Sequence, residues 1–423
     1  MSLVNNAMSQ ESKAVPQEHK ANSQEQTAVD AITIKNLDVV FGNKANQALE
    51  LLDQGKTRQE IIDETGQVVG VDNVSLTVKE GEICVLMGLS GSGKSSLLRA
   101  VNGLNEISRG SLAIKDGDKL VDLGEQCDEA TLRHLRTHRV SMVFQKFALM
   151  PWLTVLDNVA FGLEMQGVAK DVRREKAREQ LEMVGLAEWE TKFPHELSGG
   201  MQQRVGLARA FAMDTDILLM DEPFSALDPL IRAQLQDELL TLQSKLNKTI
   251  LFVSHDLDEA LKIGNNIAIM ESGQLIQHGK PEEIVLTPKT EYVKDFVAHT
   301  NPLNVLKGRS LMQPLGSLTQ ENDSWKICDA KDLWIELNEG ILSVKGESAL
   351  ALVKWSESDD LTAINSSSVV VASPEIGMRD AIKLKQISNH PILLVEDDLL
   401  VGILDNSEFY SALTGNFQLN NAA

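Results

Sequence analysis

The sequence has 423 residues, of which 43% are hydrophobic, so the chain can form roughly two or three globular domains. Its formal net charge of −21 argues against nucleic acid as a partner, because a phosphate backbone would be repelled. The three cysteines, Cys84, Cys127 and Cys328, are widely spaced and form no CxxC pair, which argues against a disulfide framework and fits a reducing cytosol.

The N-terminal segment, residues 1–30, is polar and rich in Gln, Ser and Asn. It lacks the apolar centre of a secretory signal, and we predict a disordered leader. No run of about 18 apolar residues occurs in the sequence, so no membrane-spanning helix is predicted.

The ordered chain is predicted to begin with a strand at residues 31–41, where apolar and polar residues alternate. A helical insertion follows at residues 43–67, with two short amphipathic helices separated at Gly55. Thr57 followed by Glu60 matches a capping box, which predicts where the second of these helices begins.

From residue 68 to about residue 280 the pattern indicates an α/β domain. A strand is predicted at 68–78, and buried apolar runs then alternate with helical segments, which is typical of a largely parallel sheet. The runs are "GEICVLMG" (81–88), "VSMVFQ" (140–145), "DILLMDEP" (216–223), "TILFVSH" (249–255) and "NIAIMESGQLIQHG" (266–279). A helical subdomain is predicted at about 146–205, and its segment 157–193 is mostly helical.

The chain after residue 290 is acidic and carries no phosphate-binding motif, so we predict a linker at 291–306 and a small α+β domain at 307–423. Within that domain, residues 378–414 have the pattern helix, strand, turn, strand, helix. Residues 307–375 carry no assignable pattern.

The stretch "GLSGSGKS", Gly88 to Ser95, matches the phosphate-loop motif G-x-x-x-x-G-K-[ST] and lies between an apolar strand and a helix. Backbone N–H groups in such a loop bind phosphates, Lys94 reaches the outer phosphates and the Ser95 hydroxyl ligates Mg²⁺. The motif therefore predicts a bound nucleotide. The predicted nucleotide-binding residues of this loop are Gly88, Ser90, Gly91, Ser92, Gly93, Lys94, Ser95 and Ser96.

Polar side chains follow three of the other strands. Asp221 is predicted to hold Mg²⁺, and Glu222 to orient and deprotonate the attacking water. His255 can bind the γ-phosphate, and Gln145 can contact both Mg²⁺ and the water. The alternatives are ordinary strand-end acids, a structural histidine and a surface glutamine.

A second turn, Ser198–Gly199–Gly200, opens a predicted helix and has no lysine. A helix N-terminus offers free N–H groups to an anion.

The ordered set "GLSGSGKS", "FQ", "LSGGMQQR", "LLMDEP", "SALD" and "SH" resembles the ATPase subunit of ABC transporters over residues 31–290. The resemblance implies a RecA-like P-loop NTPase core, a helical subdomain and a homodimer whose two cassettes meet head to tail. It implies that Ser198, Gly199 and Gly200 of one copy close on the ATP held by Lys94 of the other. It also implies that Asp228 belongs to the site, because Ser225–Asp228 match the loop that joins the two active sites in the family.

More narrowly, the insertion and "CVLMGLSGSGKSSLLRAVNGL" resemble ATPases of glycine betaine/proline/choline import systems, most of all choline systems. Met201, where the wider family usually has Gln, matches this osmoprotectant branch. The resemblance implies integral-membrane permease subunits, a periplasmic substrate-binding protein and a place at the cytoplasmic face of the bacterial inner membrane. It also implies a regulatory C-terminal domain, which is CBS-like only at 378–414.

Two further features follow from the resemblance. Phe41 matches the aromatic residue that stacks on adenine, although it can also be a core strand residue. The segment after Gln145 matches the surface that docks a permease coupling helix, and its apolar cluster is Met150, Pro151, Trp152 and Leu153. Ordinary core packing is the alternative for each member of that cluster.

The expected function is ATP-driven import of a quaternary amine, choline or glycine betaine. Import of another small polar solute such as an amino acid is the first alternative. An ABC ATPase of DNA repair or translation, and a nucleotide sensor that does not hydrolyse, are the others.

Overall fold

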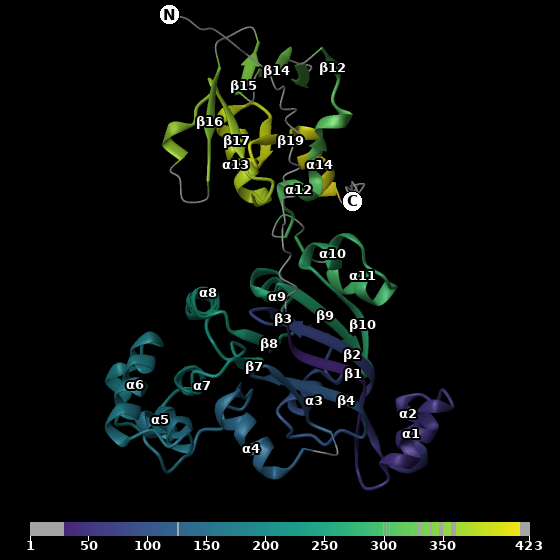
Figure 1. The fold of residues 1–423 in the computed structure, drawn as a ribbon, viewed down its shortest axis with the longest axis vertical. Coiled ribbons are helices and arrows are strands. Elements are labelled where there is room, and N and C mark those ends of the chain that lie inside the picture. Colours follow the sequence, from purple (N-terminus) through teal and green to yellow (C-terminus); the bar gives the residue numbers. More distant parts are fainter. Residues whose placement is uncertain are drawn as a thin grey trace, which may run out of the picture.

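The structure is a computed structural model that describes residues 29–124, 127–298, 300, 301, 303, 305–322, 324–328, 331–338, 341–346, 350–356 and 361–414. All but the last two residues of the predicted leader, 1–30, lie outside the described residues. Figure 1 shows a large α/β body, the cassette, with a smaller C-terminal body beyond helices α10 and α11.

A four-stranded antiparallel sheet in the order β2-β1-β4-β5 forms one layer of the cassette. Its strands are β1 (Asp30–Phe41), β2 (Val68–Lys79), β4 (Arg109–Asp116) and β5 (Lys119–Asp122). The strands predicted at 31–41 and 68–78 are confirmed. Their pairing into a separate sheet with β4 and β5 goes beyond the prediction, because alternation identifies a strand but not its partner.

The second layer is a six-stranded sheet in the order β10-β9-β3-β8-β7-β6, parallel except for the β9–β10 hairpin. Its strands are β3 (Ile83–Met87), β6 (Val140–Val143), β7 (Ile217–Asp221), β8 (Thr249–Val253), β9 (Asn266–Glu271) and β10 (Gln274–Gly279). The predicted parallel sheet is confirmed. Every residue of β3, β7 and β8 is buried, because both faces of the sheet are covered.

Two apolar cores lie on the two faces of the parallel sheet. One fills the space between the sheets around α3 (Lys94–Val101). The other packs the helical subdomain and the helices that follow β7 and β8 against the opposite face. The helices flanking the sheet are α4 (Glu129–His138), α8 (Pro229–Leu246) and α9 (Leu257–Ile263), and those of the subdomain are α5 (Val155–Met165), α6 (Lys170–Met183) and α7 (Gly199–Ala212).

The helical insertion lies at the opposite end of the cassette from α5 and α6 (Figure 1). It consists of α1 (Ala45–Asp53) and α2 (Arg58–Thr65), which confirms two helices separated at Gly55. The capping box of Thr57 and Glu60 forms as predicted.

The linker predicted at 291–306 is wrong over its first half. Helices α10 (Pro281–Leu286) and α11 (Glu291–Val297) pack on the cassette, and Val293 and Val297 are part of its core. Valines at i and i+4 share one helix face, so this segment is amphipathic rather than a spacer.

The C-terminal body is α+β. Residues 378–414 fold as α13 (Met378–Ser388), β18 (Ile392–Glu396), β19 (Leu399–Leu404) and α14 (Asn406–Thr414), which confirms helix, strand, strand, helix. They belong to a sheet in the order β11-β19-β18-β17-β16. The other strands of this sheet are β11 (Gln313–Pro314), β16 (Ala351–Lys354) and β17 (Ser368–Ala372), and helix α12 (Gly308–Leu311) precedes β11.

Within the unassigned segment 307–375 the structure also places an antiparallel sheet of four short strands in chain order. The strands are β12 (Gln320–Glu321), β13 (Ser324–Cys328), β14 (Leu333–Asn338) and β15 (Ile341–Lys345). Strand β12 has two residues, and β13, β14 and β15 mix polar and charged residues with apolar ones, so no buried apolar run marks them in the sequence.

A fold prediction concerns Asn158, a fully buried residue of α5. Its side chain bonds both backbone groups of Met150 and the carbonyls of Leu153 and Thr154, at 2.8–3.1 Å. Asn158→Ala removes all four bonds and takes the acceptor from the part-buried Met150 N–H, while the carbonyls of Met150 and Thr154 keep their backbone partners; we expect a loss of about 2 kcal/mol in the free energy of unfolding. Denaturant unfolding measures it. Glu179→Ala on the exposed face of α6 is the matched control and should stay within about 0.5 kcal/mol of the parent.

Candidate active site

The phosphate loop lies between β3 and α3, and two of its glycines abut the backbone of neighbouring strands. A Cβ atom on Gly88 would lie 2.1 Å from the carbonyl oxygen of Met270, and one on Gly93 would lie 2.4 Å from that of Gly70. Both glycines also have positive φ, 141° and 102°. Only glycine fits these two positions without a shift of the neighbouring strands.

Lys94 is buried at the first turn of α3. Its ammonium donates to the carbonyl oxygens of Gly88 (2.8 Å) and Leu89 (2.9 Å), and to the hydroxyl of Ser92 (3.3 Å). Burial lowers the pKa of Lys94, and the carboxylates of Glu222 and Asp221 act in the opposite direction. The cation is therefore held inside the loop by oxygen atoms.

Asp221 is fully buried at the end of β7 and faces the start of α3. It accepts a hydrogen bond from the Ser95 hydroxyl at 2.8 Å and pairs with Arg99 at 3.3 Å. Arg99 is absent from the predicted site. Its position four residues after Ser95, on the same face of a helix, is the signal that could have found it.

The structure brings together Glu222, Gln145 and His255, which come from the ends of three neighbouring strands. The Glu222 carboxylate accepts from the Gln145 amide at 3.0 Å and lies 3.3 Å from Nδ1 of His255. Glu222 has a φ of 49°, so its backbone is in the left-handed region. That turn directs the side chain out of the strand and into the cluster.

The second predicted phosphate turn stands apart from the first in this chain. Ser198 is exposed and caps α7, and its hydroxyl accepts from the Met201 N–H at 3.4 Å. Gly200 faces the carbonyl of Ala226. Within the described part of the chain no hydrogen bond or ion pair joins Ser198–Gly200 to the loop of Lys94.

Gln203 is a functional candidate that the sequence analysis missed. It is 1% exposed, and its amide donates to the Glu222 carbonyl at 3.2 Å while its oxygen accepts from the Ala226 N–H at 3.1 Å. Arg209, further along α7, donates to the carbonyls of Phe147 and Ala148. Helix α7 is thus tied both to the loop after Glu222 and to the loop after Gln145.

The two remaining predicted residues lie at the edges of the site. Phe41 is 40% exposed at the end of β1, beside Gly70 and Ser96, so it is not a core residue. Asp228 caps α8, where its carboxylate accepts from the Ile231 N–H at 3.1 Å.

Comparison with known proteins agrees with this arrangement. A model of the ABC transporter family matches residues 71–225. The glycine betaine transport ATP-binding protein OpuAA of Bacillus subtilis (strain 168) is 41% identical over 403 residues, which is 92% of this chain and 94% of that protein. This chain belongs to the ABC transporter ATP-binding family.

Other relatives place the ABC ATPase among osmoprotectant systems. ProV of Escherichia coli (strain K12), a glycine betaine/proline betaine transport system ATP-binding protein, is 52% identical over 63% of this chain and 65% of that protein. A dimeric structure of the ATP-binding cassette MJ0796 bound to ADP and Pi superposes with a TM-score of 0.51 at 30% identity. That match covers 59% of this chain and 98% of the other. Choline appears in none of these names.

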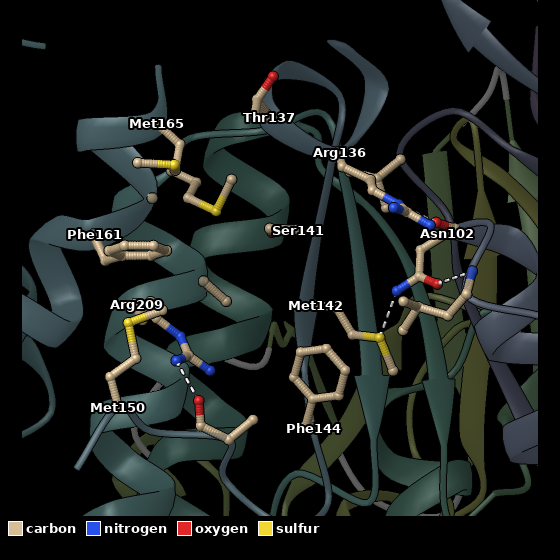
Figure 2. A pocket seen from close by; sticks show the side chains of 16 residues that line it. Asn102, Arg136, Thr137, Ser141, Met142, Phe144, Met150, Phe161, Met165 and Arg209 are labelled. Atoms are coloured by element: carbon tan, nitrogen blue, oxygen red, sulfur yellow. Dashed lines mark hydrogen bonds between the residues drawn. The ribbon is translucent and has the colours of Figure 1, made fainter. Parts of the chain in front are cut away.

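A mostly apolar cavity of about 350 Å³ opens between the parallel sheet and the helical subdomain of the ABC ATPase. Figure 2 shows Met142 and Phe144 from β6 and its following loop on one side, with Phe161 and Met165 of α5 across from them. Met150 lines the cavity, and nearby Trp152 is 73% exposed. Core packing therefore does not account for Trp152. Among the helices that the structure describes, none is long and apolar enough to cross a membrane.

A paired glycine substitution tests the phosphate loop. Gly93→Ala places a Cβ against the Gly70 carbonyl, whereas the Cβ of Gly91→Ala meets nothing within 4 Å. We expect Gly93→Ala to weaken ATP binding at least about tenfold, while Gly91→Ala, with a φ of 81°, costs only about 1 kcal/mol of backbone strain. Equilibrium ATP binding measures both, and equal losses would contradict the steric argument.

Proposed function

We propose that this chain is the ATP-hydrolysing subunit that powers import of a quaternary amine, choline or glycine betaine, across the bacterial inner membrane. The observation that carries the proposal is the match to a glycine betaine transport ATP-binding protein over 92% of the chain, C-terminal region included. The geometry around Glu222 supports the hydrolytic part.

Nucleotide binding falls to the phosphate loop. The N–H groups of residues 90–96 and the Lys94 ammonium hold the phosphates of ATP, and the exposed ring of Phe41 stacks on the adenine. Lys94 exchanges its contacts with loop carbonyls for contacts with phosphate oxygens, so its charge stays compensated.

Mg²⁺ fits the oxygen atoms at the end of β7. Ser95 and Asp221 present a hydroxyl and a carboxylate 2.8 Å apart. Gln145, the third proposed ligand, contacts Glu222, the residue that follows Asp221. Mg²⁺ typically takes one or two protein oxygens together with phosphates and waters, which suits this small set. When bound, the ion neutralises charge on the phosphates. Arg99 holds the second oxygen of Asp221.

Glu222 is the general base in this proposal. Gln145 and His255 both contact its carboxylate, so they orient it toward an attacking water. The left-handed backbone at Glu222 and the bond from Gln203 to its carbonyl keep the carboxylate at that position.

A homodimer completes the site. Ser198, Gly199 and Gly200 present a helix N-terminus with an exposed hydroxyl, and in the described structure they contact no group of their own phosphate loop. In a head-to-tail pair this turn binds the γ-phosphate held by the other copy, with Asp228 and its loop between the two sites. The dimeric ATP-binding cassette MJ0796 supports such a pairing.

The cavity in Figure 2 is proposed to receive a coupling helix of an integral-membrane permease at the cytoplasmic face. Its apolar lining and the exposed Trp152 suit a helix inserted into a groove. The contacts of Arg209 to Phe147 and Ala148 link this groove to α7, so a change at the nucleotide can reach the permease.

The amine itself is proposed to bind a separate periplasmic protein, and residues 307–423 to regulate the ATPase. The relatives' names favour glycine betaine, whereas the resemblance of the insertion favours choline. Import of another small polar solute such as an amino acid is the second candidate, because the residues assigned to ATP binding and hydrolysis do not determine which solute the permease carries.

Substitution of the base tests the mechanism. Glu222→Gln keeps the hydrogen bond from Gln145 but removes proton acceptance, so hydrolysis should fall at least about a hundredfold. ATP binding should persist, and the variant should form an ATP-dependent dimer in size-exclusion chromatography. Near-normal hydrolysis would show that another group acts as the base.

The substrate is tested by transport. In proteoliposomes with its permease and binding protein, the chain should drive ATP-dependent uptake of radiolabelled choline or glycine betaine. Uptake should stop with Glu222→Gln. Saturable uptake of an amino acid, with neither amine competing, would establish the alternative.

A further inference from the structure

The helical insertion reaches the phosphate loop through one side chain. Arg58, the first residue of α2, donates from Nη1 to the carbonyl oxygen of Gly91 at 3.1 Å. We propose that Arg58 is a positioning residue for ATP, through which the insertion sets the affinity of the phosphate loop. This inference rests on the nucleotide-binding part of the proposed function.

The insertion is built to hold Arg58 in place. Leu49 and Ile61 pack with Val40 and Val69 of β1 and β2 in a small apolar cluster. The two ends of the insertion are joined by a hydrogen bond. The buried side chain of Gln67, at its end, accepts from the N–H of Lys44, at its start, at 3.0 Å.

Two further interactions fix the ends of the helices. The last residue of α1, Asp53, pairs with Arg109 of β4, which also pairs with buried Asp38. The capping box of Thr57 and Glu60 fixes the start of α2, one residue before Arg58.

The contacted carbonyl belongs to an exposed residue of the loop. Gly91 is exposed, has a φ of 81°, and nothing lies within 4 Å of its Cβ position. In a trans peptide the C=O and the following N–H point in opposite directions. The Ser92 N–H donates to the Leu89 carbonyl at 3.2 Å, the same oxygen that Lys94 contacts, so it points to the inside of the loop. A donor that holds the Gly91 carbonyl from outside keeps the peptide in this orientation, in which the Ser92 N–H can exchange Leu89 for a phosphate oxygen.

Charge adds to this geometric effect. Burial lowers the pKa of Arg58, with Asp72 opposing, and the guanidinium keeps its positive charge at neutral pH. Among the hydrogen bonds of the described residues, one of its five N–H donors is used. A charged donor on a carbonyl polarises the peptide and strengthens the next N–H as a donor, and the charge itself favours a polyphosphate nearby.

The test compares two neighbouring cations of the insertion in the full-length chain. Arg58→Ala should weaken binding of a fluorescent ATP analogue, and raise KM for ATP, by about three- to tenfold, as expected for one charged hydrogen bond at a half-exposed site. The value of kcat should change by less than about twofold, and Arg58→Lys should recover part of the affinity. Lys56→Ala, which removes only an exposed ion pair with Glu64, should bind as the parent does.

Unchanged affinity in Arg58→Ala would overturn the proposal. So would an equal loss in Lys56→Ala, since the effect would then come from the stability of the insertion. Melting temperatures of both variants separate these cases. If the parent binds ATP without hydrolysing it, the proposed function fails while the binding comparison still decides the role of Arg58.

Discussion

The active site depends on a steric constraint: the phosphate loop is clamped where the two sheets of the cassette meet. Gly88 abuts the Met270 carbonyl of the parallel sheet, and Gly93 abuts the Gly70 carbonyl of the antiparallel sheet. Gly273, in the β9–β10 turn, donates to the Ser92 carbonyl at 3.0 Å and accepts from the Asp72 N–H at 2.9 Å. This one residue connects the loop to both sheets, so the loop keeps its shape only if the two layers keep their spacing.

Local chemistry was the part of the structure that the sequence could predict. Thr57 and Glu60 predicted a helix start, and the glycines around Lys94 predicted the loop. Both features require particular residue types at particular positions, so each can be recognised from a few neighbouring residues. Gln203 was missed because its role depends on two backbone groups, at Glu222 and Ala226, that meet it only in the folded chain. The antiparallel sheet and the short strands of 320–345 were missed for the same reason: partners come from elsewhere in the chain.

Two segments that lie outside both sheets, the insertion and helix α11, reach the phosphate loop. The insertion does so through Arg58, and α11 does so through Tyr292, whose hydroxyl accepts from the Leu89 N–H at 3.3 Å. Helix α11 is also the last element of the cassette before the C-terminal body, which contacts α10 through a bond from Ser310 to Glu282 at 2.6 Å. The prediction of a linker at 291–306 missed helix α11 and its contact with the phosphate loop. An amphipathic helix of seven residues gives only a weak periodic signal in the sequence.

The hydrogen bonds of Gln203 have a consequence for ATP hydrolysis at the two sites of the proposed dimer. In the proposed pair, Glu222 serves the nucleotide of its own chain, whereas Ser198 on α7 serves that of the other chain. Because Gln203 ties α7 to the Glu222 carbonyl, a movement of the base in one chain favours a movement of the turn that faces the second nucleotide. Turnover at the two sites would then be cooperative, and a dimer with one inactive copy would lose more than half of its activity.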